Sequence, residues 1–349
     1  MNYDAWNIRP FSGTLAPIDL QRHLVGWAVL AANSHNVQPW RFILWPDENR
    51  IDICLDPAGV LSASDKHSRQ AYISVGCALE NLVLAAKNYN LETRVEYNQS
   101  GFYPMPAASV FLAGIPALKS EGTNWFVAMI GRRMNRGKYE IEVKLPDNLA
   151  QEFQSVAQEF GLVLSAMTDV ATRITIAEVQ YFADKAVVAR NDFRKELSKY
   201  LLPNDTVSGR GMPGNTFGLS DEMAKRVNAE LSKDGEFDPD IASGIAITDR
   251  DGIRSSPLIG VISVAGDKPE WWLKAGRAFQ RMALIAELRG VAMAVNAAMV
   301  EVQMFNFALR VRLGILSRPT IVFRVGYSFD RPPHSPRMAV EEVSELGKK

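Results

Sequence analysis

Cysteine is scarce in this chain, which has two cysteines in 349 residues. Cys54 falls in an expected strand and Cys77 in an expected helix, without the CxxC spacing of a metal or redox site. We therefore expect both thiols to be buried apolar side chains. Chains without disulfides are typical of a reducing compartment, so the expected location is the cytoplasm.

The chain also has no long apolar run and no excess of one charge. No run approaches the roughly 18 apolar residues of a membrane-spanning helix, and the opening residues MNYDAWNIRPF lack the features of a signal peptide. Lys plus Arg and Asp plus Glu number 39 each, so no net field attracts nucleic acid or an acidic membrane. The expected partners are small molecules or another copy of the chain.

Several familiar catalytic patterns are missing. The four histidines, His23, His35, His67 and His334, have no metal-ligand spacing, so we expect no metal and assign them no catalytic role. No GxGxxG motif follows an expected strand, so a Rossmann nicotinamide site is not supported. These absences do not exclude an enzyme whose cofactor carries the chemistry.

An amide-rich stretch is the most distinctive feature that is present. Residues 33–40 read NSHNVQPW, and Pro39 ends any helix arriving from residues 20–32. Short amide side chains present donors and acceptors together, which suits a flat, neutral, heteroaromatic ligand. A structural role is the alternative, because Asn and Ser also favour turns by bonding their own backbone. Trp40 is expected to be a core anchor.

A second distinctive stretch is cationic. Residues 132–139 read RRMNRGKY and place four cations within seven positions. Such charges repel one another unless an anion or carboxylates lie among them, and the planar guanidinium matches phosphate oxygens. A solvated charge run is the alternative reading.

Hydrophobic periodicity predicts the regular elements. Helices are expected over residues 20–32, 72–88, 125–130, 171–200, 271–289 and 302–313, with another after Pro146. Strands are expected over residues 41–45, 51–55, 93–97, 108–113, 162–165, 258–265 and 319–327, and residues 291–296 are expected to be extended. The small residues Gly76, Cys77 and Ala78 allow a second helix to approach closely, and Gly290 is expected to cap a helix in a left-handed conformation.

Two polar stretches interrupt this pattern. Residues 202–219 are rich in Gly and Pro, which predicts an irregular loop of the kind that often forms a lid. Residues 231–243 are expected to be a second polar connection. On the helix expected over 171–200, a solvated face is predicted for Asn191, Asp192, Arg194, Lys195 and Glu196.

The run SHNVQPWRF resembles the signature of the nitroreductase-like, FMN-binding family, and RRMNRGKY resembles that family's phosphate-gripping motif. Met134 stands where the family usually has Ser or Thr. The blocks WLKAGRAFQRMALIAELRG, RPTIVFRVGY and SPRMAVEEV follow the family's second half in order. The resemblance therefore covers most of the chain, and the length resembles that of the Acg-type tandem proteins of the family.

This resemblance implies an α+β fold of two fused halves, each with a mainly antiparallel sheet flanked by helices. Residues 1–120 would carry the amide loop, and residues 121–349 would carry the Arg-rich motif, the 202–219 lid and the C-terminal Arg. In ordinary members two subunits share each flavin, and here each half holds the motif that the other lacks. The halves are therefore expected to pack as an internal pseudo-dimer with one site, and further self-association is left open.

The implied cofactor is FMN, with NAD(P)H as the possible electron donor and a small molecule as acceptor. The residues implied for FMN are Asn33, Ser34, Asn36, Gln38, Arg132, Arg136, Val295, Asn296 and Arg337. The expected activity is a ping-pong reduction of nitro, quinone or related acceptors. Two alternatives are a flavin-storage protein, with the lid over the ring, and a flavin-free interaction protein, which only Met134 favours.

Overall fold

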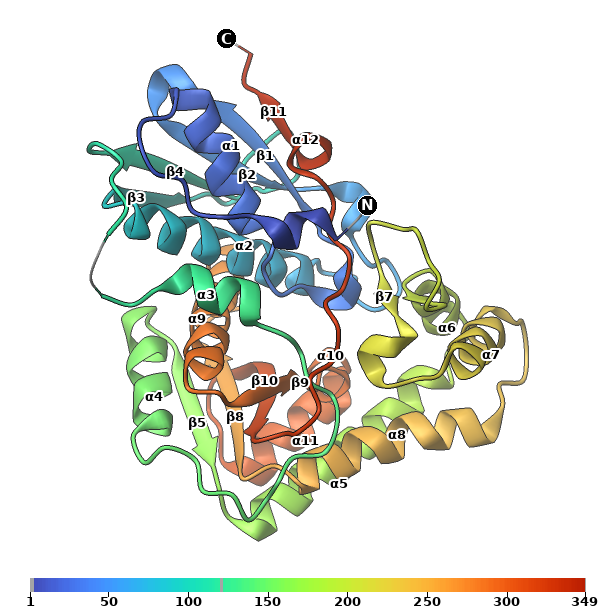
Figure 1. The fold of residues 1–349 in the computed structure, drawn as a ribbon. Helices are drawn as coiled ribbons and strands as arrows, with labels where there is room; N and C mark the ends of the chain where they lie inside the picture. Colours follow the sequence, from blue (N-terminus) through green and yellow to red (C-terminus); the bar gives the residue numbers. More distant parts are fainter. Residues whose placement is uncertain (1–2, 120–121, 349) are drawn as a thin grey trace.

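The computed structural model describes residues 3–119 and 122–348. Two main sheets form the framework, one above and one below a central pair of helices (Figure 1). The first sheet has the order β11-β1-β2-β4-β3 and the second has the order β5-β8-β10-β9. The first contains β1 (Trp40–Trp45), β2 (Arg50–Leu55), β3 (Glu92–Tyr97), β4 (Ala108–Ala113) and β11 (Ser344–Leu346). The second contains β5 (Val163–Met167), β8 (Leu258–Val264), β9 (Ala292–Val295) and β10 (Arg318–Gly326).

The two sheets repeat one topology. In chain order, the series β1, β2, β3, β4 and the series β5, β8, β9, β10 take equivalent places, and all of their neighbouring pairs are antiparallel. Only β11 joins β1 in parallel, so the end of the chain extends the sheet formed by its beginning. Figure 1 shows this tail in red, running from the second sheet back to the first. The α+β class with mainly antiparallel sheets is thus confirmed.

Helices α2 (Arg69–Asn88) and α9 (Pro269–Leu288) form the central pair. A Cβ added to Gly76 would lie 2.2 Å from the backbone oxygen of Leu273, and one added to Gly276 would lie 2.0 Å from the backbone oxygen of Ile73. Each helix therefore offers a glycine to the backbone of the other, as in a two-fold symmetric contact. The predicted close approach at Gly76 is confirmed.

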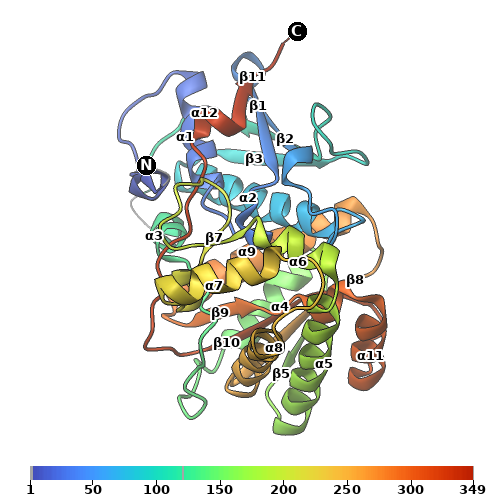
Figure 2. The same cartoon turned by 90° about the vertical axis from the view of Figure 1, so that its right-hand side faces the viewer.

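The remaining helices cover the sheets or form an insertion. The flanking helices are α1 (Pro17–Ala28), α3 (Trp125–Gly131), α4 (Leu149–Glu159), α10 (Ala298–Glu301), α11 (Gln303–Leu313) and α12 (Val340–Val343). Between β5 and β8 the chain inserts α5 (Val170–Val188), α6 (Asn191–Ser198), α7 (Asp221–Ser232) and α8 (Pro239–Arg254). Figure 2 shows α6 and α7 in front of the central helices, with α5 and α8 below them.

Several predicted details are confirmed. Cys54 and Cys77 are buried free thiols, and Trp40 is fully buried in the main core. Gly290 follows α9 with φ 66°, the left-handed conformation expected of a helix cap. Among the described residues, none of the helices combines the length and apolar character needed to cross a membrane.

Other predictions are wrong, and most of them fall in the insertion; outside it, the helix expected over residues 20–32 ends at Ala28. The helix expected over 171–200 ends at Val188 and restarts at Asn191. Its supposedly solvated face contains Arg194 and Glu196, which are 3% and 8% exposed. Arg194 donates to four oxygens. Glu196 accepts from the backbone N–H of Ala63 and from the backbone N–H and hydroxyl of Ser64 at 2.6–2.9 Å, and from the hydroxyl of Ser62 at 3.4 Å. These bonds make burial of the charges possible.

The two stretches expected to be irregular also contain regular structure. Residues 202–219 include β7 (Met212–Pro213), which pairs with β6 (Leu201–Leu202), and a 3-10 helix over Gly214–Phe217. Of residues 231–243, only residues 233–238 form a polar connection, and the others belong to the end of α7 and the start of α8. Caps explain the new helices, because Ser220 accepts from the backbone of Met223 and Asp238 accepts from that of Asp240.

Candidate functional site

The amide loop, residues 33–38, turns sharply between α1 and β1. His35, Asn36 and Gln38 have φ values of 47°, 52° and 50°, a left-handed conformation that is costly for residues other than Gly. Oδ1 of Asn33 accepts from the backbone N–H of Gln38 at 2.9 Å and so helps to close the turn. The structural role that Asn side chains play in turns is therefore present at Asn33.

The C-terminal tail, residues 335–338, lies against this loop. Nδ2 of Asn36 donates to the backbone oxygen of Pro336 at 2.8 Å, and Oδ1 of Asn36 accepts from Arg337. Oε1 of Gln38 accepts from the backbone N–H of Met338 at 2.9 Å. Two of the predicted site segments, from opposite ends of the chain, are thus brought together.

The lid segment, residues 202–219, contacts the same loop. Nδ2 of Asn36 also donates to the backbone oxygen of Gly211 at 2.8 Å, and Nε2 of Gln38 donates to that of Gly209 at 2.7 Å. Arg210 between them forms an ion pair with Asp56 at 2.7 Å. The amides of Asn36 and Gln38 therefore hold the lid and the tail in this structure.

Arg132 and Arg337 converge on the start of the amide loop. Arg132 donates to the backbone oxygen of Leu30 at 2.9 Å, and Arg337 donates to that of Ala31 at 3.3 Å. Burial lowers the pKa of Arg132 to about 10, and burial together with the charge of Arg132 lowers the pKa of Arg337. Nε of each side chain is buried without an acceptor among the described residues. Two close guanidiniums with unused donors suit an anion.

Arg136, the second basic position of the motif, has different neighbours. Its guanidinium lies 4.1 Å from the ring centroid of Phe217 in the lid segment. Burial lowers the pKa of Arg136 to about 10, against the opposing effect of Asp249. Burial in turn raises the pKa of Asp249. The charges of Arg324 and Arg136 and a hydrogen bond from Asn296 oppose this increase. Arg136 therefore shares Asp249 with Asn296, another predicted site residue.

The turn after β9 supplies Val295 and Asn296. Asn296 is 2% exposed, and its backbone N–H donates to Val322 at 2.9 Å, which continues the sheet contact with β10. Its Oδ1 has no hydrogen-bond donor among the described residues. A buried amide oxygen without a partner costs free energy unless a ligand or water satisfies it. Val295 is half-buried and pairs with Phe323.

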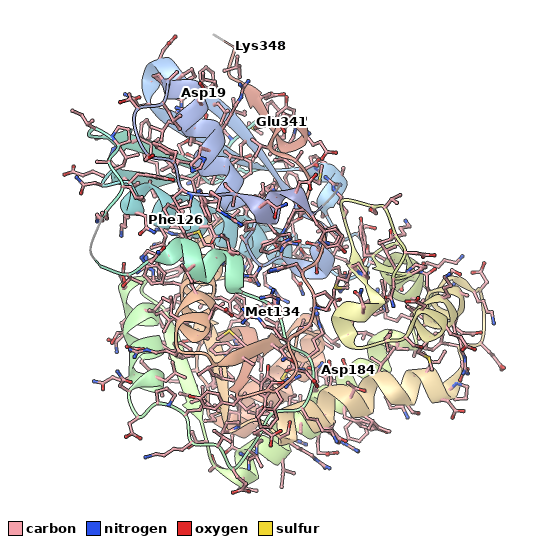
Figure 3. The ribbon with its side chains drawn as sticks, viewed as in Figure 1. Asp19, Phe126, Met134, Asp184, Glu341 and Lys348 are labelled. Atoms are coloured by element: carbon pink, nitrogen blue, oxygen red, sulfur yellow. The ribbon has the colours of Figure 1, made fainter. Side chains whose placement is uncertain are left out.

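Met134 packs against the main core rather than standing free between the arginines. Figure 3 shows it at the centre of the molecule, between the two sheets. An apolar side chain that packs inward gains burial energy, which a Ser or Thr hydroxyl would not. The departure from the family pattern therefore has a structural explanation.

Ser34 connects the amide loop to two residues that the sequence did not indicate. Oγ of Ser34 donates to Oε1 of Gln70 on α2, and Nε2 of Gln70 donates to Oε1 of Glu301 at the end of α10. Burial raises the pKa of Glu301 to about 7. Gln70 occupies a partly exposed position on α2, where a polar residue is ordinary in any helix, so this link is visible only in the fold.

The sequence motifs also did not mark Gln280 and Asn81 as site residues. Gln280 on α9 accepts from the backbone N–H of Ala32 at 3.1 Å and donates to Asn81 at 2.7 Å, and Asn81 donates to the backbone oxygen of Trp27 at 3.0 Å. Both side chains are fully buried. A polar residue inside an apolar helix stripe was the available signal, because a buried amide needs partners.

The position on α2 that corresponds to Gln280 on α9 carries a charged residue. Glu80 takes the place of Gln280, and it forms ion pairs with Arg281 at 2.5 Å and with Arg277 at 2.8 Å. Arg277 and Arg281 both lie 4.9 Å from the ring centroid of Phe160, which follows α4. Between α4 and β5 only three residues, 160–162, replace the longer connection of residues 29–39 between α1 and β1. The amide loop and its supports thus occur on one side of the pseudo-symmetric pair.

Two surface cavities of about 450 and 490 Å³ lie along α1. Both are lined by Ile8, Gly26, Val340 and Glu341, and the larger also reaches Arg337. No group of three or more His, Cys, Asp or Glu side chains suited to a metal occurs in residues 3–119 and 122–348.

An FMN molecule fits the chemistry of these donors. The unused Nε groups of Arg132 and Arg337 suit its phosphate, and the unpaired Oδ1 of Asn296 suits an N–H of a flat heterocycle. The amide loop lies between these two regions, since Asn36 bonds Arg337, and burial together with the charge of Arg136 lowers the pKa of His35 to about 4.

Comparison with known proteins confirms the resemblance to nitroreductase-like proteins of the Acg type. The chain is 22% identical over 348 residues to the "Putative NAD(P)H nitroreductase acg" of Mycobacterium tuberculosis, in both strain CDC 1551 and strain H37Rv. The match covers 95% of this chain and 96% of each relative. No protein-family model matches the chain.

Solved structures with some similarity are also nitroreductases. The FMN-dependent nitroreductase NfnB of Mycobacterium smegmatis, in complex with NADPH, is 15% identical with a TM-score of 0.42, covering 62% of this chain and 95% of its own. A nitroreductase with bound FMN from Desulfitobacterium hafniense is 14% identical with a TM-score of 0.37. This match covers 62% of the present chain and 95% of the other. At such scores the fold assignment depends on the strand order and helix packing of the chain itself.

Proposed function

We propose that the chain is an FMN-binding oxidoreductase of the nitroreductase type, with NAD(P)H as electron donor and a nitro, quinone or related compound as acceptor. The observation that supports this most directly is the meeting of the amide loop, the Arg-rich motif and the C-terminal Arg at one place. The relatives named as NAD(P)H nitroreductases support the same activity. Location in the cytoplasm stays a prediction.

The proposed site is formed by two halves within one chain. Residues 1–120 would supply Asn33, Ser34, Asn36 and Gln38, and residues 121–349 would supply the other contacts; the boundary itself lies outside the described residues. The repeated sheet order and the reciprocal glycines of α2 and α9 support this internal pseudo-dimer. The ion-paired side at Glu80 lacks the amide loop, so we propose one flavin per chain.

The five predicted residues of the second half have proposed roles toward FMN. Arg132 and Arg337 would hold the phosphate, because they are close together and have unused donors. Arg136, Val295 and Asn296 would face the ring end, near Asp249. Bound FMN would supply the hydride chemistry, with donor and acceptor using it in turn, and the protein would bind and orient the reactants.

A flavin-storage protein is the second candidate, and one observation favours it. The lid segment bonds to Asn36, Gln38 and Asp56 and covers the amide loop, which would restrict access by substrates. An enzyme with this lid would have to open it during turnover.

Two measurements test the proposal. The absorbance spectrum of the purified protein, followed by release of the flavin on denaturation, should give close to one FMN per polypeptide. Two equivalents would contradict the pseudo-dimer, and a protein that binds no added FMN would contradict the function itself. Oxidation of NADPH with a quinone or nitroaromatic acceptor then separates the enzyme from the storage protein.

A further inference from the structure

Ser34, Gln70 and Glu301 form a hydrogen-bonded chain across the proposed site. It begins in the amide loop, passes through α2, and ends in α10, which follows the Val295–Asn296 turn. Ser34 is also held through its backbone N–H, which donates to Oγ of Ser74 at 3.2 Å. The chain therefore connects the two segments that would face the flavin from either half.

We propose that Glu301, acting through Gln70, sets whether the Ser34 hydroxyl accepts from or donates to a flavin at the amide loop. This inference rests on the proposed flavin site. When Glu301 is ionised it can only accept, so the Gln70 amide N–H points to it and the amide oxygen points to Ser34. The Ser34 hydroxyl then donates its hydrogen bond to Gln70, and only the lone pairs of the Ser34 oxygen are available to a ligand.

Protonation of Glu301 allows the reverse order. A neutral carboxyl donates one hydrogen bond, which the Gln70 oxygen accepts once the amide has turned over. The Gln70 N–H then points to Ser34, and the Ser34 proton is free for a ligand. Ser34 becomes a donor without any movement of the backbone.

The surroundings place this change near neutral pH. Burial raises the pKa of Glu301 to about 7, and the other charged groups that act on it are Arg69, Asp65, Glu196 and Asp184. Arg69 opposes the increase and is itself fixed by a bond to the backbone oxygen of Val300 at 2.9 Å. The carboxylates of Asp65 and Glu196 add to it.

Riboflavin is the suitable probe, because it has no phosphate that titrates in this range. Its dissociation constant should change by about threefold or more between pH 6 and pH 8, since half a pKa unit of coupling corresponds to about that factor. Glu301→Gln keeps an acceptor for Gln70 but cannot titrate, so its dissociation constant should stay constant over the same range. Gln70→Met interrupts the chain and should remove the pH dependence even if the first variant fails to fold.

Asp65→Asn is the matched control. Burial raises the pKa of Asp65 to about 6, and Asp65 accepts from backbone N–H groups, those of Ala71 and Gln70 among them, whereas the side-chain amide of Gln70 donates to Glu301. This variant should keep a pH dependence, with its midpoint moved to lower pH because the Asp65 charge no longer raises the pKa of Glu301. A flat wild-type profile, or a pH dependence retained in both Glu301→Gln and Gln70→Met, would overturn the switch while leaving flavin binding intact. Wild-type protein that binds neither riboflavin nor FMN would overturn the proposed function, and the switch with it.

Discussion

Oδ1 of Asn36 accepts a hydrogen bond from Nη1 of Arg337 at 2.5 Å, across 301 positions of sequence. Both side chains are buried, and Arg337 also lies over the ring of Trp6, 4.9 Å from the ring centroid. The bond fixes the C-terminal tail on the amide loop. It also leaves Nε of Arg337 without an acceptor, near Arg132, where a phosphate would accept hydrogen bonds from both side chains.

Replacing Arg337 with Met should therefore weaken FMN much more than riboflavin. Loss of one charge-assisted hydrogen bond costs about 1.5 to 3 kcal/mol, or roughly 10- to 150-fold in affinity, and riboflavin has no phosphate to lose. Titration of both ligands by fluorescence quenching gives the comparison. Arg331→Met is the control, because Arg331 is exposed and pairs with Glu287.

Arg136→Ala tests the other end of the proposed site. Its neighbours are Phe217 and Asp249, whereas Arg132 and Arg337 bond to Leu30 and Ala31, so we expect similar losses of affinity for FMN and riboflavin. A loss confined to FMN would instead put Arg136 at the phosphate, as the resemblance of its motif implies.

Arg210→Ala should release the lid segment. The Arg210–Asp56 pair is partly buried, with side chains 23% and 12% exposed, and it closes the lid between the bonds to Asn36 and Gln38. We expect FMN to dissociate several-fold faster while thermal stability changes little. Arg226→Ala on α7 removes the ion pair with Asp238, in which the Arg226 side chain is 54% exposed, and should leave the dissociation rate unchanged. Equal rates in all three proteins would show that the segment is not a lid.

The sequence predicted the two sheets and the central helices well, because each carries a clear apolar stripe. It failed in the insertion, where the first residues of α8 were expected to belong to a polar connection over residues 231–243. Gly252 has a packing reason that only the fold shows: a Cβ there would lie 2.8 Å from the guanidinium carbon of Arg324. Arg194 was misread for a similar reason, since most of its partners are backbone oxygens, which no residue type in the sequence reveals.

The candidate site could be predicted as a list of motifs but not as a geometry. The motifs identified Asn36 and Arg337, whereas their direct bond depends on how the tail returns to β1. Supporting residues such as Gln280 and Glu301 belong to no motif, because their role comes from contacts between halves.

Gly276→Ala should strongly destabilise the fold. The new Cβ would meet the backbone oxygen of Ile73 at 2.0 Å, and a backbone atom cannot move aside as a flexible side chain can. Overpacking of this kind costs about 1 to 3 kcal/mol or more, measurable by urea unfolding. Gly244→Ala on α8 is the control, because a Cβ there meets nothing within 4 Å. That variant should gain about 0.5 to 1 kcal/mol from helix propensity.

Glu301→Gln should stabilise the flavin-free protein in a pH-dependent way. Burial raises the pKa of Glu301 from 4.5 to about 7, so the folded state binds this proton more tightly than the unfolded state. Below pH 4.5 the carboxyl is protonated in both states, and the variant should differ little from wild type in its pH trend. As the pH rises to about 7, the wild type loses stability because the buried group must ionise, whereas the neutral amide does not. The difference in melting temperature between variant and wild type should therefore grow between pH 4.5 and 7 and then level off. A constant difference across this range would mean that Glu301 is ionised in the folded protein throughout.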